Sequence, residues 1–157
     1  MIQRVQTIFL FLIVIGMGTC LFSTSWLETG QSGEQATLTA FQLEARRAGT
    51  VISSLPVYYI AILAVLAAGV AAYSAFQYRN RLLQIKLGTL NSLLMAALLG
   101  CIMYFSTQVG EGLVNPALQG RYATGLYAVI LALICNMLAN RFIRRDEQLV
   151  RSADRMR

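Results

Sequence analysis

The sequence contains no histidine, and it has few charged residues of any kind. Without imidazole, the chain cannot form histidine-ligated haem, histidine zinc sites or histidine proton relays. Charged residues make up 13% of the chain, whereas a soluble domain has roughly 25%. Cys20, Cys101 and Cys135 lie in apolar stretches and form no C-x-x-C pair, which favours packing roles over thiol redox chemistry. The composition therefore predicts neither a water-soluble globule nor a cofactor.

The sequence contains long apolar stretches without charged residues. Four uncharged stretches each approach the length of about 20 residues that crosses a bilayer, at about residues 8–27, 56–77, 87–107 and 122–140. The first stretch is long for the h-region of a cleaved signal peptide, so we interpret it as a span. The sequence predicts an all-α integral membrane protein, a four-transmembrane-helix bundle in a single domain over residues 1–157.

The predicted spans divide the basic residues unevenly. Three lie on one side: Arg46, Arg47 and Arg121. Ten lie on the side that holds both termini: Arg4, Arg79, Arg81, Lys86, Arg141, Arg144, Arg145, Arg151, Arg155 and Arg157. The positive-inside rule places this larger group, and both termini, in the cytoplasm. Because membrane orientation explains the basic residues and no nucleic-acid fold motif is present, we predict no nucleic-acid partner.

Small residues at four-residue spacing mark the surfaces expected to hold the bundle together, because membrane helices associate through close packing. In the third span these are Gly88, Ser92, Ala96 and Gly100, and in the second span Ala64, Ala68 and Ala72. The short connection over about 78–86 predicts that these two spans form an antiparallel hairpin. The same stripe could instead form a homodimer interface.

Two amides, Asn91 and Asn136, lie inside the apolar stretches about one turn from the cytoplasmic side. An amide in hydrocarbon requires a hydrogen-bond partner. We expect the two to bond to each other or to backbone carbonyls of a neighbouring helix, as structural contacts. A transport pathway is the alternative role for polar groups at this depth.

The outer loop over about 28–55 is the largest segment expected outside the membrane. Gly30 and Gly33 predict a turn, and the run 37–41 has the composition of a strand, so a small extracytoplasmic β-hairpin is expected. The run 44–48 suits a helix equally well. Pro56 is expected to begin the second span, and Asn115-Pro116 to mark a turn in the second outer loop.

The tail over 141–157 predicts a cytoplasmic, amphipathic extension of the last helix, because no proline or glycine interrupts it. Glu147 precedes Arg151 by four residues, which is a favourable helical pair. Six arginines in this tail predict attraction to anionic headgroups at the cytoplasmic face. A docking site for a protein partner is the alternative.

Three segments together carry a family resemblance: residues 1–7, the inner loop 78–87 and the tail 138–155. The chain resembles a family of small four-span inner-membrane proteins from Bacteroidota that carries only a domain-of-unknown-function label. The resemblance implies a multi-pass protein of the bacterial cytoplasmic membrane and supplies no reaction or ligand. All three segments fall on the predicted cytoplasmic side, so the candidate interaction surface comprises Arg4, Arg79, Asn80, Arg81, Gln84, Asn140, Arg141, Asp146, Glu147 and Arg151.

Three function classes remain open on these grounds. A non-catalytic accessory or scaffolding component of a membrane complex fits best, because the spans carry no ionisable group and no catalytic constellation is present. A small oligomeric transporter or channel is the first alternative. A membrane-embedded enzyme acting on lipids is the second, and its acids would have to be Asp146, Glu147 or Asp154, for which ion pairing is the expected role.

Overall fold

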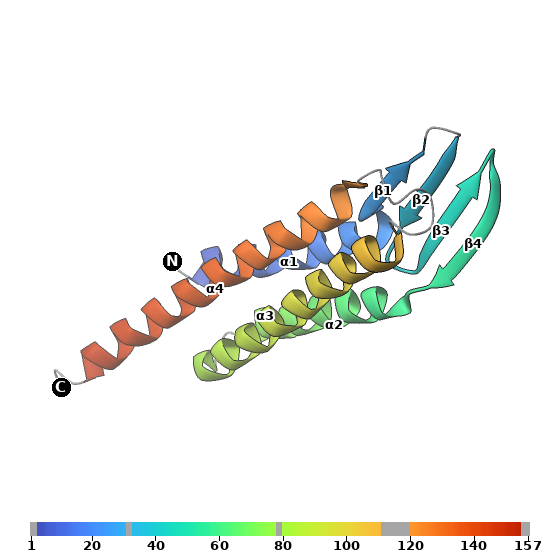
Figure 1. Ribbon diagram of the computed structural model, residues 1–157. Coiled ribbons are helices and arrows are strands. Elements are labelled where there is room, and N and C mark those ends of the chain that lie inside the picture. Colours follow the sequence, from blue (N-terminus) through green and yellow to red (C-terminus); the bar gives the residue numbers. More distant parts are fainter. Residues whose placement is uncertain (1–2, 31–32, 78–79, 111–119, 155–157) are drawn as a thin grey trace.

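The computed structural model describes residues 3–30, 33–77, 80–110 and 120–154 of the chain, and the side chains of residues 6–149 within these ranges. Four long helices form the main body: α1 (Gln3–Phe22), α2 (Tyr58–Phe76), α3 (Arg81–Tyr104) and α4 (Thr124–Asp154). They run alternately up and down, and each packs against two neighbours, α1 and α3 both contacting α2 and α4 (Figure 1). The expected hairpin of the second and third helices is therefore present.

Three of these helices are long and apolar enough to cross a membrane. The qualifying segments are Tyr58–Phe76, Arg81–Gly110 and Thr124–Leu149, while the apolar part of α1 is the shorter stretch Gln6–Phe22. The sequence had predicted a first span reaching Leu27, and this boundary is wrong. The helix ends at Phe22, and Trp26 and Leu27 belong to a strand. Hydropathy could not separate the two, because both segments bury apolar side chains.

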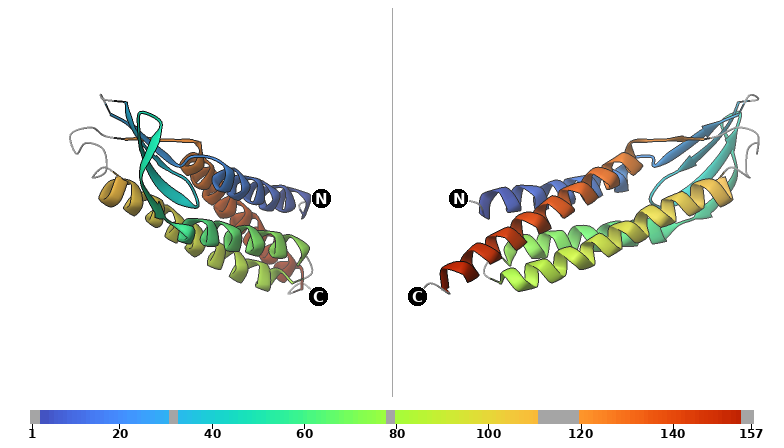
Figure 2. Two further views of the ribbon diagram at one scale, coloured as in Figure 1. Left: turned by 90° about the vertical axis from the view of Figure 1, so that its right-hand side faces the viewer. Right: turned by 60° about the vertical axis from the view of Figure 1, so that its left-hand side comes forward.

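A five-stranded antiparallel sheet stands at one end of the bundle (Figures 1 and 2), so the all-α class predicted from the sequence is wrong. Its strands are β1 (Trp26–Thr29), β2 (Glu34–Leu38), β3 (Gln42–Arg47), β4 (Thr50–Pro56) and β5 (Arg121–Tyr122), in the order β4-β3-β2-β1-β5. The expected hairpin is only part of this sheet. The segment 44–47 is strand rather than helix, and Pro56 ends β4 instead of beginning α2.

Pairing from distant parts of the chain builds the sheet. Trp26 pairs with Leu38 on one side and with Tyr122 on the other, so β5, which immediately precedes α4, is joined to β1, which follows α1. Gly33 has a positive φ of 77° in the connection between β1 and β2, as its predicted turn role requires. The predicted turn at Asn115-Pro116 lies outside the described residues.

Trp26 anchors the sheet on the bundle. Its indole ring is buried, and it lies against Gly110, the last residue of the π-helical turn η1 (Phe105–Gly110) that extends α3. A Cβ at Gly110 would come within 2.7 Å of the ring, and a Cβ at Gly120 would overlap it. Glycine at these two positions therefore lets the end of α3 and the start of β5 close around the tryptophan.

Candidate functional site

The end of the bundle opposite the sheet is called here the basic end, and it holds both termini (Figure 1). At this end α4 continues past the other three helices (Figures 1 and 2). The continuous helix from Thr124 to Asp154 agrees with the predicted helical tail over the described residues. Because no helix packs around its final turns, side chains on several faces of α4 are open to a ligand or a membrane surface.

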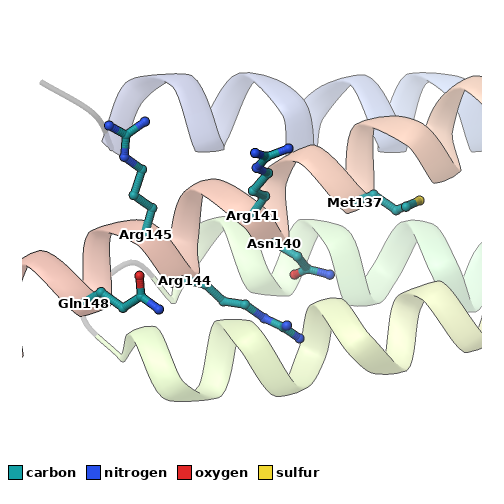
Figure 3. A pocket seen from close by; sticks show the side chains of 6 residues that line it. All are labelled: Met137, Asn140, Arg141, Arg144, Arg145 and Gln148. Atoms are coloured by element: carbon teal, nitrogen blue, oxygen red, sulfur yellow. The ribbon is translucent and has the colours of Figure 1, made fainter.

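One face of α4 forms a hollow of about 720 Å³ at this end (Figure 3). The residues that line it repeat every three or four positions in two neighbouring rows, so they cover one broad side of α4. The residues are Met137, Asn140, Arg141, Arg144, Arg145 and Gln148, and we call this surface the arginine face. The side chains of Arg141 and Arg145 point to one side of α4, and that of Arg144 points to the other (Figure 3). Among the residues whose side chains the structure describes, no acidic one lines this hollow.

Asp146 is kept away from the arginine face by an ion pair. The Arg81 Nη2 atom lies 3.2 Å from the Asp146 carboxylate, and Nη1 donates to the Asp146 backbone carbonyl at 3.2 Å. Both side chains are largely covered, at 25% and 15% exposure. This contact joins the beginning of α3 to α4 and fixes the level at which the two helices meet.

Asn140 connects the arginine face to α3. Its amide fills the space where a Cβ would stand at Gly88, so α3 and α4 approach closely at this point. One turn deeper, Asn136 donates its amide to the Gly88 carbonyl at 2.9 Å and to the Ser92 hydroxyl at 2.7 Å. The first two residues of the predicted stripe thus pack against α4. Ala96 and Gly100 are exposed instead.

Several alanine side chains of α2 pack inside the bundle. Ala64 is buried together with Ala61, Ala67 and Ala71, whereas Ala68 and Ala72 are only partly covered. On the other side of the bundle, Gly16 of α1 allows close contact with Ala132 of α4. Helix contacts within the chain therefore use Gly88, Ser92 and Ala64.

The polarity of the side chains buried inside the bundle differs between its two halves. The half nearer the sheet buries apolar side chains, among them Ile13, Met17, Leu98 and Ile102. The half at the basic end buries neutral polar groups from all four helices: Gln6, Ser74, Gln84, Asn91 and Asn136. Gln84 donates to the Ser74 carbonyl at 2.9 Å, and thereby connects α3 to α2. These groups are neutral at any ordinary pH, so the interior offers no acid or base.

Asn91 does not make the hydrogen bond expected from the sequence. It is 1% exposed, and neither atom of its amide has a protein hydrogen-bond partner in the described part of the chain. Asn136 instead uses one of the two expected options, a backbone carbonyl across the bundle. Hydropathy predicted the depth of both amides in the apolar stretches, but it could not predict the rotation of each helix about its axis, which decides which groups meet.

The ten nominated surface residues fall into several places. Asn140 and Arg141 lie on the arginine face, Arg81 and Asp146 form the ion pair, and Gln84 is buried. Asn80 is exposed directly before α3, and Glu147 is half-buried on α4. Arg79 lies outside the described residues, as do the side chains of Arg4 and Arg151.

Sequence reasoning missed four residues of the arginine face: Met137, Arg144, Arg145 and Gln148. The signal was present, because each lies three, four or seven residues from Asn140 or Arg141 along the chain. Elsewhere, no group of three metal-ligating side chains was found among the described residues. The charged side chains that line the hollow at this end are the three arginines.

Comparison with known families places the chain in one of them. Residues 2–156 match the family described as Domain of unknown function (DUF4293), so the chain belongs to that family. No curated protein matches the chain.

Proposed function

We propose that this member of the DUF4293 family is a non-catalytic accessory or scaffolding component of a bacterial cytoplasmic-membrane complex. In this proposal all four helices cross the bilayer and the basic end is cytoplasmic. The arginine face then binds the anionic headgroups of the inner leaflet. The observation that carries the proposal is this face itself, where three arginines and, of the described side chains, no acid line one hollow of α4.

The packing of α1 supports its role as the fourth span. It is 20 residues long, which corresponds to about 30 Å of helix, close to the thickness of the hydrocarbon core. It packs against α2 and α4, two of the candidate spans, so it lies at their depth. Its outward side chains are apolar, including the exposed Ile8, Phe11 and Ile15, as contact with lipid requires.

Aromatic side chains at the sheet end of the bundle support the position of the membrane. Tyr58 and Tyr59 begin α2, Tyr104 ends α3, and Tyr127 lies in the first turn of α4, and all four are exposed. Tyrosine is enriched at membrane–water interfaces, where its ring and hydroxyl face apolar and polar surroundings. Such a belt supports the proposal that the sheet lies outside the membrane and the arginine face at the opposite surface.

The headgroup proposal can be tested with a triple variant, Arg141→Gln, Arg144→Gln and Arg145→Gln. Purified protein in phosphatidylcholine nanodiscs is titrated with phosphatidylglycerol, and bound lipid is counted by native mass spectrometry. Because a basic residue near an anionic surface contributes about 1 kcal/mol, each substitution is expected to weaken binding about 5-fold. The matched control removes the same charge at the sheet end, by Arg46→Gln, Arg47→Gln and Arg121→Gln. Equal binding by the two triple variants would refute the proposal.

The scaffolding part requires a protein partner and has a separate test. Native extraction into nanodiscs from the source membrane is expected to recover another protein at near-equal stoichiometry. Recovery of a homo-oligomer alone, together with ion flux in liposomes, would contradict scaffolding and favour the transporter alternative.

A further inference from the structure

A second hollow, of about 680 Å³, lies along α3. It is lined by Ile85, Lys86, Thr89, Leu90, Ser92, Leu93 and Ala96, and we call it the α3 groove. It falls within the candidate span Arg81–Gly110, so most of its length lies at bilayer depth if that helix crosses the membrane. Apart from Lys86 at one end and the hydroxyls of Thr89 and Ser92, its lining is apolar.

The α3 groove and the arginine face meet along the seam between α3 and α4. Ser92 lines the groove and is bonded by Asn136, the residue next to Met137 of the arginine face. Asn140, also of the arginine face, packs on Gly88 of α3. Asn136 and Asn140 of α4 therefore contact α3 at residues that line or adjoin the α3 groove.

Two contacts show which basic groups lie at the same level. On α3, Lys86 lies between Arg81, which pairs with Asp146, and Gly88, which contacts Asn140. On α4, Arg144 lies between these same partners, Asn140 and Asp146. Because the helices are antiparallel, these contacts put the backbone of Lys86 level with Arg141, and Arg144 lies less than one turn further along α4. The Arg144 side chain runs back toward Asn140 (Figure 3), so its guanidinium extends toward the level of Lys86. Arg144 points toward α3, whereas Arg141 and Arg145 point toward the opposite side (Figure 3).

We propose that one anionic phospholipid of the inner leaflet binds across this seam, with its phosphate between Lys86 and Arg144 and one acyl chain in the α3 groove. The inference rests on the proposed function, since it names the lipid bound at one edge of the arginine face. Charge complementarity favours an anionic headgroup, because each hollow contributes a cation and, within the described part of the chain, no acid lines either hollow.

Shape and solvation identify the rest of the occupant. Beyond Lys86 the groove becomes apolar toward the bilayer centre, ending at Ala96, and Gly100 one turn further has no heavy atom within 4 Å of a Cβ position. A flexible chain can lie along this surface with its phosphate at the two cations. A second copy of the protein packed there would bury Lys86 and Arg144 against apolar helix, which costs several kcal/mol for each unpaired charge.

Four single variants distinguish the contribution of the lipid headgroup from that of its acyl chain. Each variant is placed in phosphatidylcholine nanodiscs and titrated with phosphatidylglycerol. Lys86→Gln and Arg144→Gln are each expected to weaken binding about 5-fold, from the surface value for one basic residue. Ala96→Phe fills the groove and is expected to cause loss of the tightest-bound phosphatidylglycerol. Its matched control is Ala97→Phe, because Ala97 is also exposed on α3 but does not line the groove. That control should bind as the unmodified protein does.

Several outcomes would overturn the inference without touching the proposed function. One such outcome is that the arginine triple variant weakens phosphatidylglycerol binding while Ala96→Phe and Ala97→Phe bind this lipid equally well. In that case the headgroup binds without an acyl chain in the α3 groove. If soluble glycerol phosphate displaces phosphatidylglycerol completely, the ligand is a free phosphate. If Ala96→Phe dissociates a dimer in the same spectra, the groove is an interface between copies. If the arginine triple variant bound phosphatidylglycerol as well as the unmodified protein does, this result would instead refute the proposed function itself.

Discussion

The amide of Asn140 occupies the space that a side chain at Gly88 would need, and this relationship sets how closely α3 and α4 approach. The same contact positions Asn136 to bond the Gly88 carbonyl and the Ser92 hydroxyl. It also sets the spacing between α3 and α4 where the arginine face adjoins α3. The contact between the two helices therefore depends on one small residue, Gly88.

Gly88→Ala is expected to lower the free energy of unfolding by about 1–3 kcal/mol, the usual cost of overpacking a close contact. The added methyl would overlap the Asn140 amide, so the seam must open. Denaturation in mixed micelles measures the loss, and combining the change with Asn140→Ala should restore part of it. Gly100→Ala is the control, since nothing lies within 4 Å of that Cβ. Equal effects at Gly88 and Gly100 would show that the seam is looser than described.

Gly120→Ala is expected to displace the indole of Trp26, which it would overlap. The sequence contains one tryptophan, so its fluorescence reports on the joint between sheet and bundle. The buried ring should emit at short wavelength in the unmodified protein and shift to longer wavelength in the variant. Gly18→Ala, at a position with no neighbouring atom within 4 Å, should leave the spectrum unchanged. An unshifted spectrum in Gly120→Ala would contradict the packing of Trp26.

Asn91 and Asn136 are expected to respond in opposite ways to replacement by leucine. Asn91→Leu removes an amide without a protein hydrogen bond in the described part of the chain, and should stabilise the bundle by about 1–3 kcal/mol. Asn136→Leu removes two hydrogen bonds, worth together about 1 kcal/mol inside a membrane, and should destabilise it. Unfolding in micelles compares the two. Destabilisation by Asn91→Leu would mean that its amide has a partner in the membrane, as the transporter alternative requires.

The sequence predicted the helices well and the sheet poorly, for a physical reason. Uncharged runs of about 20 residues and the unbroken 141–157 tail are local signals, and α2, α3 and α4 follow them closely. The sheet depends on pairing between distant segments, such as Trp26 with Tyr122, and β5 has only two residues. Trp26 and Leu27 also extended the first apolar run, which hid the change from helix to strand.

The arginine face was predicted only in part, for a different reason. Its members repeat at helical spacing, so Arg144 and Arg145 could have been included with Arg141. The seam with α3 could not have been predicted, because it depends on which faces of α3 and α4 meet. Composition placed Gln84 among the surface candidates, whereas its hydrogen bond to the Ser74 carbonyl holds it inside the bundle.

The proposal that α1 is a fourth span and that the basic end is cytoplasmic has one direct test. Cys20, Cys101 and Cys135 are replaced with alanine, and one cysteine is introduced by Gln3→Cys at the first residue of α1, or by Ile52→Cys or Gln148→Cys at exposed positions at opposite ends of the fold. Spheroplasts are treated with a membrane-impermeant maleimide before and after permeabilisation. Ile52→Cys should react in intact spheroplasts, and Gln3→Cys and Gln148→Cys should react only after permeabilisation. Labelling of Gln148→Cys in intact spheroplasts would contradict the orientation, and labelling of Gln3→Cys there would contradict the fourth span.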